Sequence, residues 1–373
     1  MSSLPVHATA APFVPESPLA KMRHADPLAR ALSRLHLGPY WVVLIVAAYG
    51  SLHAIALPAL FGHLYAAQGV PGALDDWPNL VILLLLVPLV VGYYAWQPAI
   101  IQAMYDGIAV RASRSPAAAA RAAELLHPLG WSVWALTAIA VGLLECVIWL
   151  VDLHGRVILT WQNANWLMIA SLMPLRFLVF YALVFMLVRQ AVVLYGLNRF
   201  FLEFSVEIQP LHPDRAGGLR MLGDYVLTNG LLIGVVGLIL GLGLLRARAN
   251  VAVLTPEFYG ELIVYFLAAP TVFFLLPLYS AHKRMVEAKH KLLAEISEQF
   301  DLEYRVLLDG LRQNVLHLDE VERLEAIQKI YAITQSSPDW PFNLGLMSKF
   351  GAAVLLPVLA PLGVDLFANL FLK

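Results

Sequence analysis

Five ionisable residues lie in or beside apolar stretches of the sequence, where a charged group is costly. A stretch of about 20 apolar residues can cross the hydrocarbon core of a membrane, and Glu145, Arg176 and Asp365 each stand inside such a stretch. A charge at the centre of a membrane helix costs about 2.5–3.5 kcal/mol on insertion scales, so it usually faces protein or water. His53 and Glu261 have similar positions in two further stretches. These five residues are therefore our candidates for an ion or proton pathway.

The predicted depths of these residues place them in one leaflet. With a helix rise of 1.5 Å per residue, Glu145 lies roughly 9 Å and Arg176 roughly 15 Å below the outer surface, and the other three fall in the same outer half. Two interpretations follow. Either Glu145 and Arg176 form a buried pair that holds their helices together, or the group lines a hydrated outer cavity that binds a cation or proton. The sequence leaves both open.

The composition is that of a membrane protein. The chain has 373 residues, of which 60% are hydrophobic and 14% charged, and its mean hydropathy is +0.71. Soluble domains carry about 25% charged residues. The net charge of −1 argues against nucleic acid as a partner. Cys146 is the single cysteine, so no intrachain disulfide can form.

Seven apolar stretches qualify as membrane-spanning helices by length and lack of charge. The fold class that we predict is all-α, a polytopic bundle of about seven transmembrane helices with a cytoplasmic helical hairpin. Pro357 and Pro361 interrupt the last stretch, so its full crossing of the membrane is left open. The predicted spans are 40–61, 78–98, 131–151, 166–189, 222–245, 258–280 and 346–371.

The distribution of basic residues predicts the orientation. With the amino terminus in the cytoplasm, twenty of the 25 basic residues fall in cytoplasmic segments. This set includes Arg189, at the end of the fourth predicted span. The four outer ones are Arg156, Arg246, Arg248 and Lys373. Because cytoplasmic loops of membrane proteins are enriched in Lys and Arg, this bias favours a cytoplasmic amino terminus.

The chain divides into four regions. Residues 1–37 are predicted to be a disordered arm, up to about residue 20, followed by a short basic amphipathic helix on the inner membrane surface. Residues 38–280 form the six-span bundle, and 346–373 the seventh, proline-broken span. Residues 281–345 carry two apolar patterns at helical spacing with Gly310 between them, which predicts the cytoplasmic hairpin. This hairpin either packs only on itself or binds a partner or a second copy.

Four glycines in the fifth span are spaced by four, three and four residues. This spacing puts them on one face of a helix, where a neighbouring backbone can approach closely. We interpret them as packing positions rather than as a pore lining. They are Gly230, Gly234, Gly237 and Gly241.

A tight loop is predicted just before the fifth span, in the sequence HPDRAGG from His212 to Gly218. Proline sets the turn, Asp214 caps it, and the two final glycines allow positive backbone angles. Arg215 is expected to pair with Asp214 or with lipid headgroups. This loop, together with Asp339-Trp340-Pro341-Phe342, resembles segments of uncharacterised polytopic bacterial inner-membrane proteins. The resemblance implies a bacterial inner membrane and no particular activity.

The sequence therefore supports two functional hypotheses. The first is a channel or secondary transporter for a small ion, with the five candidate residues at an outer cavity. The alternative is a membrane-anchored scaffold or sensor, in which residues 281–335 bind a cytoplasmic partner or drive oligomerisation. A third hypothesis, an enzyme acting on lipid, has the least support, because the chain lacks the phosphate loop, HExxH, GxSxG and paired CxxC motifs. We expect no cofactor and no metal site. The expected partners are the lipid bilayer and either a cytoplasmic protein or another copy of the chain.

Overall fold

The computed structural model describes residues 18–66, 70–112, 121, 124–155, 160–203, 212, 214, 216–248, 276–313, 318–340, 348 and 351–352. These residues form helices and connecting turns, without a β-strand in the ranges given. Five helices are long and apolar enough to cross a membrane: Pro39–Phe61, Trp77–Ile108, Val133–Val151, Trp166–Glu203 and Arg220–Arg246. They match the first five predicted spans. The sixth and seventh lie almost wholly outside the described residues, so the count of seven stays a prediction.

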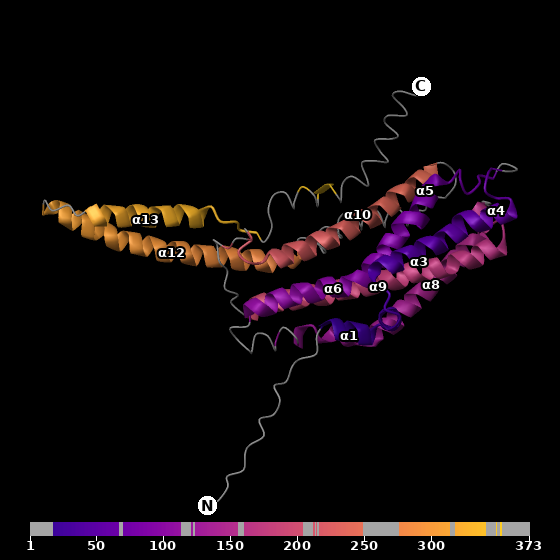
Figure 1. Cartoon of the computed structure of the whole chain (residues 1–373), viewed down its shortest axis with the longest axis horizontal. Coiled ribbons are helices and arrows are strands. Elements are labelled where there is room, and N and C mark those ends of the chain that lie inside the picture. Colours follow the sequence, from indigo (N-terminus) through magenta and orange to yellow (C-terminus); the bar gives the residue numbers. More distant parts are fainter. Residues whose placement is uncertain are drawn as a thin grey trace, which may run out of the picture.

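The five spans form a bundle of long, tilted helices (Figure 1). Two of them contain a π-helical turn, and their segments follow one another without a break. The first of these two spans consists of α3 (Pro39–Ser51), η1 (Leu52–Ala56) and α4 (Leu57–Phe61). The second span consists of α5 (Trp77–Val81), η2 (Ile82–Leu86) and α6 (Val87–Ala112). The others are α8 (Val133–Gly155), α9 (Trp166–Glu203) and α10 (Arg220–Arg248). The short 3₁₀ helices η3 (His127–Gly130) and η4 (Trp161–Asn163) lie in the connections.

Glycine lets the first two spans approach closely. A Cβ atom on Gly50 of α3 would lie 2.5 Å from the carbonyl oxygen of Leu83 in η2. That is closer than a methyl group can approach a backbone atom, so the glycine permits this contact between backbones. Pro39 begins α3 at its first turn, where the missing N–H of proline costs nothing.

Two of the spanning helices extend well past their predicted ends. Helix α9 has 38 residues, about 57 Å at 1.5 Å per residue, whereas a hydrocarbon core is about 30 Å thick. It ends at Glu203 rather than near residue 189, and α6 ends at Ala112 rather than near residue 98. Apolar packing beyond the span explains the difference.

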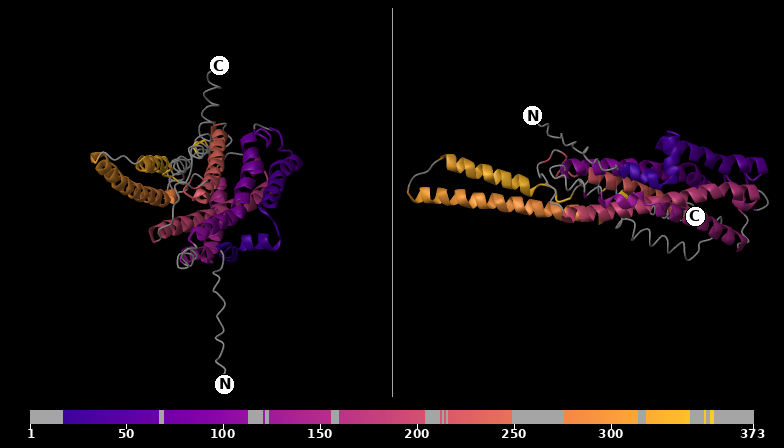
Figure 2. Two further views of the ribbon diagram at one scale, coloured as in Figure 1. Left: turned by 60° about the vertical axis from the view of Figure 1, so that its left-hand side comes forward. Right: turned by 90° about the horizontal axis from the view of Figure 1, so that it is seen from below.

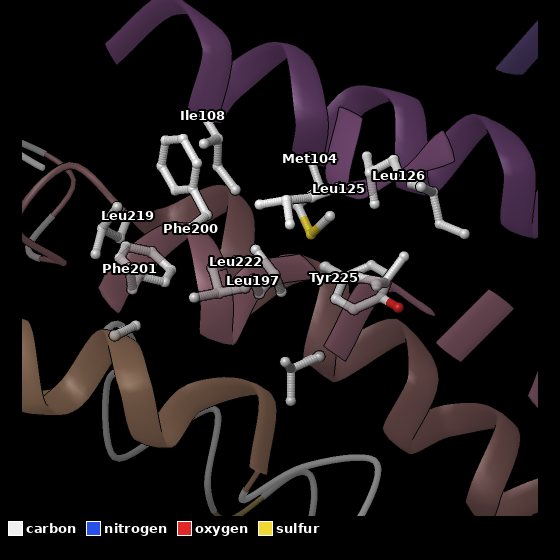
Figure 3. Packing of buried hydrophobic residues seen from close by; sticks show 14 of the residues in the cluster. Met104, Ile108, Leu125, Leu126, Leu197, Phe200, Phe201, Leu219, Leu222 and Tyr225 are labelled. Atoms are coloured by element: carbon white, nitrogen blue, oxygen red, sulfur yellow. The ribbon is translucent and has the colours of Figure 1, made fainter. Parts of the chain in front are cut away.

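This packing forms a hydrophobic cluster, which we call the base core, at the end of the bundle where α6 and α9 end. Met104 and Ile108 of α6 meet Phe200 and Phe201 of α9 and Tyr225 of α10 (Figure 3). Helices α1 (Pro18–Ala25) and α12 (Leu276–Arg312) add Met22, Ala281 and Met285, each at most 2% exposed. We call this end of the bundle the base end.

Helix α12 continues from the base core away from the bundle, with α13 (Leu318–Gln335) packed along it (Figures 1 and 2). A break between the two helices was predicted at Gly310, but α12 continues through this residue and ends at Arg312. The connection at 314–317 lies outside the described residues. The hairpin and its cytoplasmic side therefore stay predictions, and we call residues 292–335 the arm.

The described part of the amino-terminal segment consists of two short helices. Residues 1–17 lie outside the described part, but α1 begins at Pro18 and α2 (Pro27–Arg34) follows it. Met22 and Ala25 of α1 are buried against the bundle. The backbone N–H of Leu19 also donates to Gln102 of α6 at 3.0 Å.

Candidate functional site

Glu145 and Arg176 face each other across α8 and α9. The guanidinium of Arg176 donates to a carboxylate oxygen of Glu145 and lies 5.3 Å from the centre of the Trp149 ring. The two side chains are 20% and 27% exposed. The thiol of Cys146 donates to the carbonyl of Met173 at 3.7 Å. This pair links two neighbouring helices, and the guanidinium neutralises the carboxylate.

His53 lies on the π-helical turn η1 and contacts α9 at Ser171, five residues before Arg176. It is completely buried; its Nδ1 lies 2.7 Å from the hydroxyl of Ser171, and its ring packs against Trp161. Among the described residues its Nε2 has no partner. Within the described residues, His53 forms no hydrogen bond or ion pair with Glu145 or Arg176. Asp365 and Glu261 lie outside the described residues, so the predicted convergence of all five groups stays untested.

An ion pair lies at the end of the bundle opposite the base end. Arg246, at the end of α10, binds Asp76, the residue before α5, with its Nη2 at 2.9 Å from the carboxylate. The indole N–H of Trp161 donates to the same carboxylate at 3.1 Å, and Arg246 also donates to Gln162. Asp76 is almost fully buried. From the sequence, Arg246 was assigned only to the outer basic residues. Its pairing with Asp76 was not predicted, because the two residues are 170 positions apart.

The most completely buried charges form a cluster near the base end, centred on Asp26. Its carboxylate accepts hydrogen bonds from the guanidinium of Arg189 at 2.7 Å, from the hydroxyl of Tyr181 at 2.7 Å and from the hydroxyl of Tyr94. It also accepts from the backbone N–H groups of Leu28 and Ala29 at 3.1 and 3.2 Å. We call this group the Asp26 cluster.

Burial and charge are balanced in the Asp26 cluster. Asp26 is 0% and Arg189 2% exposed. A buried ion pair is favourable only if further hydrogen bonds satisfy its remaining groups. Arg189 meets this condition by donating to the carbonyl of Tyr94 at 3.1 Å and by lying over the Tyr94 and Phe185 rings. Asp26 thus caps α2 and joins the amino-terminal segment to α6 and α9.

This cluster was not predicted from the sequence. Asp26 followed by Pro27 is a typical helix start, but this pattern carries no information on burial. Arg189 was counted as a cytoplasmic basic residue, whereas it is buried between helices. Arg189 follows an apolar run of the sequence, and this run was the only feature that could have indicated its burial.

A second set of buried polar groups continues from this region into α10. The hydroxyl of Tyr93 donates to Asn229 at 2.7 Å, and Asn229 donates to the carbonyl of Tyr225 at 3.1 Å. The hydroxyl of Tyr225 in turn bonds to Gln190 of α9. These contacts hold α6, α9 and α10 in register, because a buried polar group without a partner is costly.

The loop before α10 has the turn that its sequence predicts. Asp214 accepts from the backbone N–H groups of Ala216 and Gly218 at 3.0 and 2.9 Å, and Gly217 and Gly218 have positive φ angles of 63° and 86°. Partial burial acts to raise the pKa of Asp214, but these hydrogen bonds outweigh burial and hold the pKa below its usual value. The Asp214 N–H lies 3.3 Å from His212 Nδ1. Arg215 lies outside the described residues.

The four glycines of the fifth span are all buried in α10. A cavity of about 390 Å³ lies beside this helix, between α3, α6 and α10. Its lining is apolar and includes Val43, Leu89, Trp96 and Val235. None of the candidate ion-pathway residues contributes to this lining.

The chemistry available in the described part of the chain is that of paired charges and hydrogen bonds. Within the described residues, no group of three or more His, Cys, Asp and Glu side chains is placed to hold a metal ion. Comparison of the chain with family models, with curated proteins and with solved structures gave no match in any of the three.

Proposed function

We propose that the protein is a membrane-anchored scaffold, in which the helical bundle holds the arm at the membrane and the arm binds a partner protein. The observation that supports this proposal is the exposure of large apolar side chains on the arm. Leu302 and Val306 of α12 are each 52% exposed, and Ile330 and Ile333 of α13 are 48% and 49% exposed. Leu302 and Val306 are four residues apart and Ile330 and Ile333 three apart, so each pair lies on one face of its helix. Exposed apolar side chains on one helix face favour a protein interface.

The attachment of α12 to the bundle suits this role. Arg284 donates to the carbonyls of Phe201 and Leu202, the latter at 2.9 Å, at the end of α9. Carbonyls in the last turn of a helix commonly need donors from outside it, and Arg284 supplies such donors at the end of the described part of α9. Together with buried Ala281 and Met285, this contact joins α12 firmly to the base core.

The far end of α13 returns to the same place. Lys289 of α12 forms an ion pair with Asp339 and a hydrogen bond to the carbonyl of Ser337, both at 2.8 Å. The ring of His282 stacks on Trp340 with centroids 3.9 Å apart. The two helices are therefore held at the bundle, and their surfaces beyond that point are open to a partner.

The charges of the bundle favour an anchor over an ion pathway. Glu145 is paired with Arg176, Asp76 with Arg246, and Asp26 with Arg189. A permeation path needs groups that exchange their partners with the ion, whereas each of these carboxylates already has a guanidinium within the protein. The transport hypothesis receives no comparable support from the described residues.

Deletion of the arm tests the proposal. Residues 292–335 are replaced by a short Gly–Ser linker, and proteins crosslinked to the chain in intact cells are identified after purification. We expect the full chain to recover a defined set of partners that the shortened chain loses.

The matched control is the Glu145→Gln, Arg176→Gln variant, which removes the intramembrane pair and leaves the arm intact. It is expected to keep the same partners if it folds. Recovery of an unchanged set by the shortened chain would overturn the scaffold proposal. Loss of the set by the control, at normal thermal stability, would also contradict it.

A further inference from the structure

The arm is acidic, although the segment that joins it to the bundle is basic. Residues 292–335 contain nine acidic and four basic residues, a net charge of −5. The preceding segment 281–291 contains Lys283, Arg284, Lys289 and Lys291 with a single acid, Glu287. The charge therefore changes sign along α12.

Several of the arm's carboxylates are available to a partner. Glu298, Asp301 and Glu322 are exposed and form no ion pair with the described residues. By contrast, Glu325 lies 3.9 Å from Lys329, and Asp309 lies 3.3 Å from Arg312. Glu295 lies 4.0 Å from Lys291, but Glu298 and Asp301 follow it on α12 without such a partner among the described residues, and with the net charge of −5 they give this part of the surface a negative potential.

An apolar groove lies in the same part of the arm, between α12 and α13. It encloses about 260 Å³ and is lined by Ile296, Phe300, Ile327 and Tyr331, with Ser297, Asp301 and Gln328 at its polar positions. Phe300 also stacks on Tyr304, which is 45% exposed. A groove of this kind accepts apolar side chains from one face of a helix.

We infer that this groove binds an amphipathic helix of a partner protein whose apolar face is flanked by Lys and Arg. The apolar side chains enter between α12 and α13, and the basic side chains meet Glu298 and Asp301. Complementary charge gives such an interface its specificity and speeds association. This inference rests on the proposed function and names the chemistry of the partner.

The charge of the arm disfavours two other occupants. A second copy of the arm would bring like charges together, which is costly unless they are paired. A bilayer with anionic headgroups attracts basic segments and repels acidic ones. The groove and the acids together therefore favour a basic protein partner.

Peptide binding to the intact protein tests this inference. The full chain is placed in nanodiscs of zwitterionic phosphatidylcholine, so that the lipid does not attract cationic peptides by charge, and binding to empty nanodiscs of the same lipid is subtracted. Two fluorescent amphipathic helical peptides are titrated, one of leucine and lysine and one of leucine and glutamate in the same pattern. We expect saturable binding of the lysine peptide that weakens as salt is raised, and at least tenfold weaker binding of the glutamate peptide.

Variants of the groove are compared with variants of the arm tip, by which we mean the end of α12 and the start of α13. Glu298→Lys with Asp301→Lys should weaken the lysine peptide at least tenfold, and Ile327→Ser should weaken it without changing the salt dependence. The control, Asp309→Lys with Asp319→Lys, makes the same change in charge near the tip and should have a much smaller effect. Equal binding of both peptides, or equal effects of groove and tip variants, would overturn the inference. Dimers whose affinity depends on the groove would identify a second copy as the occupant and would also overturn it.

The outcomes separate this inference from the scaffold proposal. If deletion of the arm removes the cellular partners but the lysine peptide binds no better than the glutamate peptide, only the chemistry of the partner is wrong. If the shortened chain keeps its cellular partners, the scaffold proposal itself fails.

Discussion

At the scale of single residues, burial decides what a charge can do. Asp26, Asp76 and Glu145 are all acids, and each is paired with an arginine, but only Asp26 has five donors to its carboxylate. Asp26 is therefore the most completely hydrogen-bonded of these three carboxylates. Such groups act chiefly on stability and on the choice of one packing arrangement.

Neutralising Asp26 should destabilise the protein strongly. Asp26→Asn leaves Arg189 buried without its counter-charge, and breaking a buried pair typically costs about 3–5 kcal/mol. Thermal unfolding of the purified protein measures the effect, and replacing Arg189 with Gln in the same chain should recover part of it. Asp224→Asn is the control, because Asp224 is 63% exposed and 3.7 Å from Arg220, so its loss should have little effect. A small effect of Asp26→Asn would show that the cluster is not needed for packing.

The pair between Glu145 and Arg176 should show direct coupling. A double-mutant cycle with Glu145→Gln and Arg176→Gln measures the interaction free energy from unfolding of the two single variants and the double variant. For contacting residues we expect a coupling of about 0.5–3 kcal/mol. A coupling near zero would mean that each side chain acts independently, and the link between α8 and α9 would have to come from apolar packing alone.

At the scale of the elements, caps and helix lengths determine how the bundle is assembled. Helix α9 continues to Glu203 because the base core buries Phe200 and Phe201, at 3% and 1% exposure, below the predicted span. Asp214 then organises the turn from which α10 begins. The same end of the bundle receives α12 through Arg284. The base end is therefore built by several elements, each fixed by one terminal contact.

The stability provided by Asp214 should depend on pH. Its pKa is lower in the folded protein than its usual value of about 3.9, so the ionised form stabilises the fold. This contribution is complete above the unfolded pKa and is lost as the pH falls through the lowered folded pKa. Asp214→Asn should therefore be less stable than the native chain near pH 7, and the difference should shrink below pH 4. A difference that stays constant with pH would contradict the role of the charge.

At the scale of the whole molecule, the bundle has two distinct ends. The pair of Asp76 with Arg246 closes one end, and the Asp26 cluster and the base core form the other. Helix α1 and the first part of α12 lie together at the base end, where Met22 and Met285 belong to the same hydrophobic cluster. The bias of the basic residues predicts that this end faces the cytoplasm.

Cysteine labelling tests this orientation. Cys146→Ser removes the single cysteine, and cysteines are then introduced one at a time at Arg23, Tyr65 and Glu298, all of them exposed. A membrane-impermeant maleimide should label position 65 in right-side-out vesicles and should reach positions 23 and 298 only after the membrane is opened. Labelling of position 298 from outside would place the arm on the other side and would overturn the predicted topology.

Part of the fold and part of the site could be predicted from the sequence because they depend on local properties. Five of the seven predicted spans match apolar helices of the structure, because the length of an apolar run can be read from consecutive residues. The turn at Asp214 follows from its proline and its two glycines in the same way. Glu145 and Arg176 were recognised as costly charges on consecutive spans, which made them candidates for one pair.

Only the tertiary structure decided which distant groups meet. Asp26 and Arg189 are 163 residues apart, and neither sits in a pattern that specifies the other. Their contact depends on how α1 and α2 pack against α6 and α9, and that packing depends on the summed burial of many side chains. Local composition therefore determines that this chain enters a membrane. The three-dimensional arrangement determines which of its charges are buried in pairs and which remain exposed on the arm.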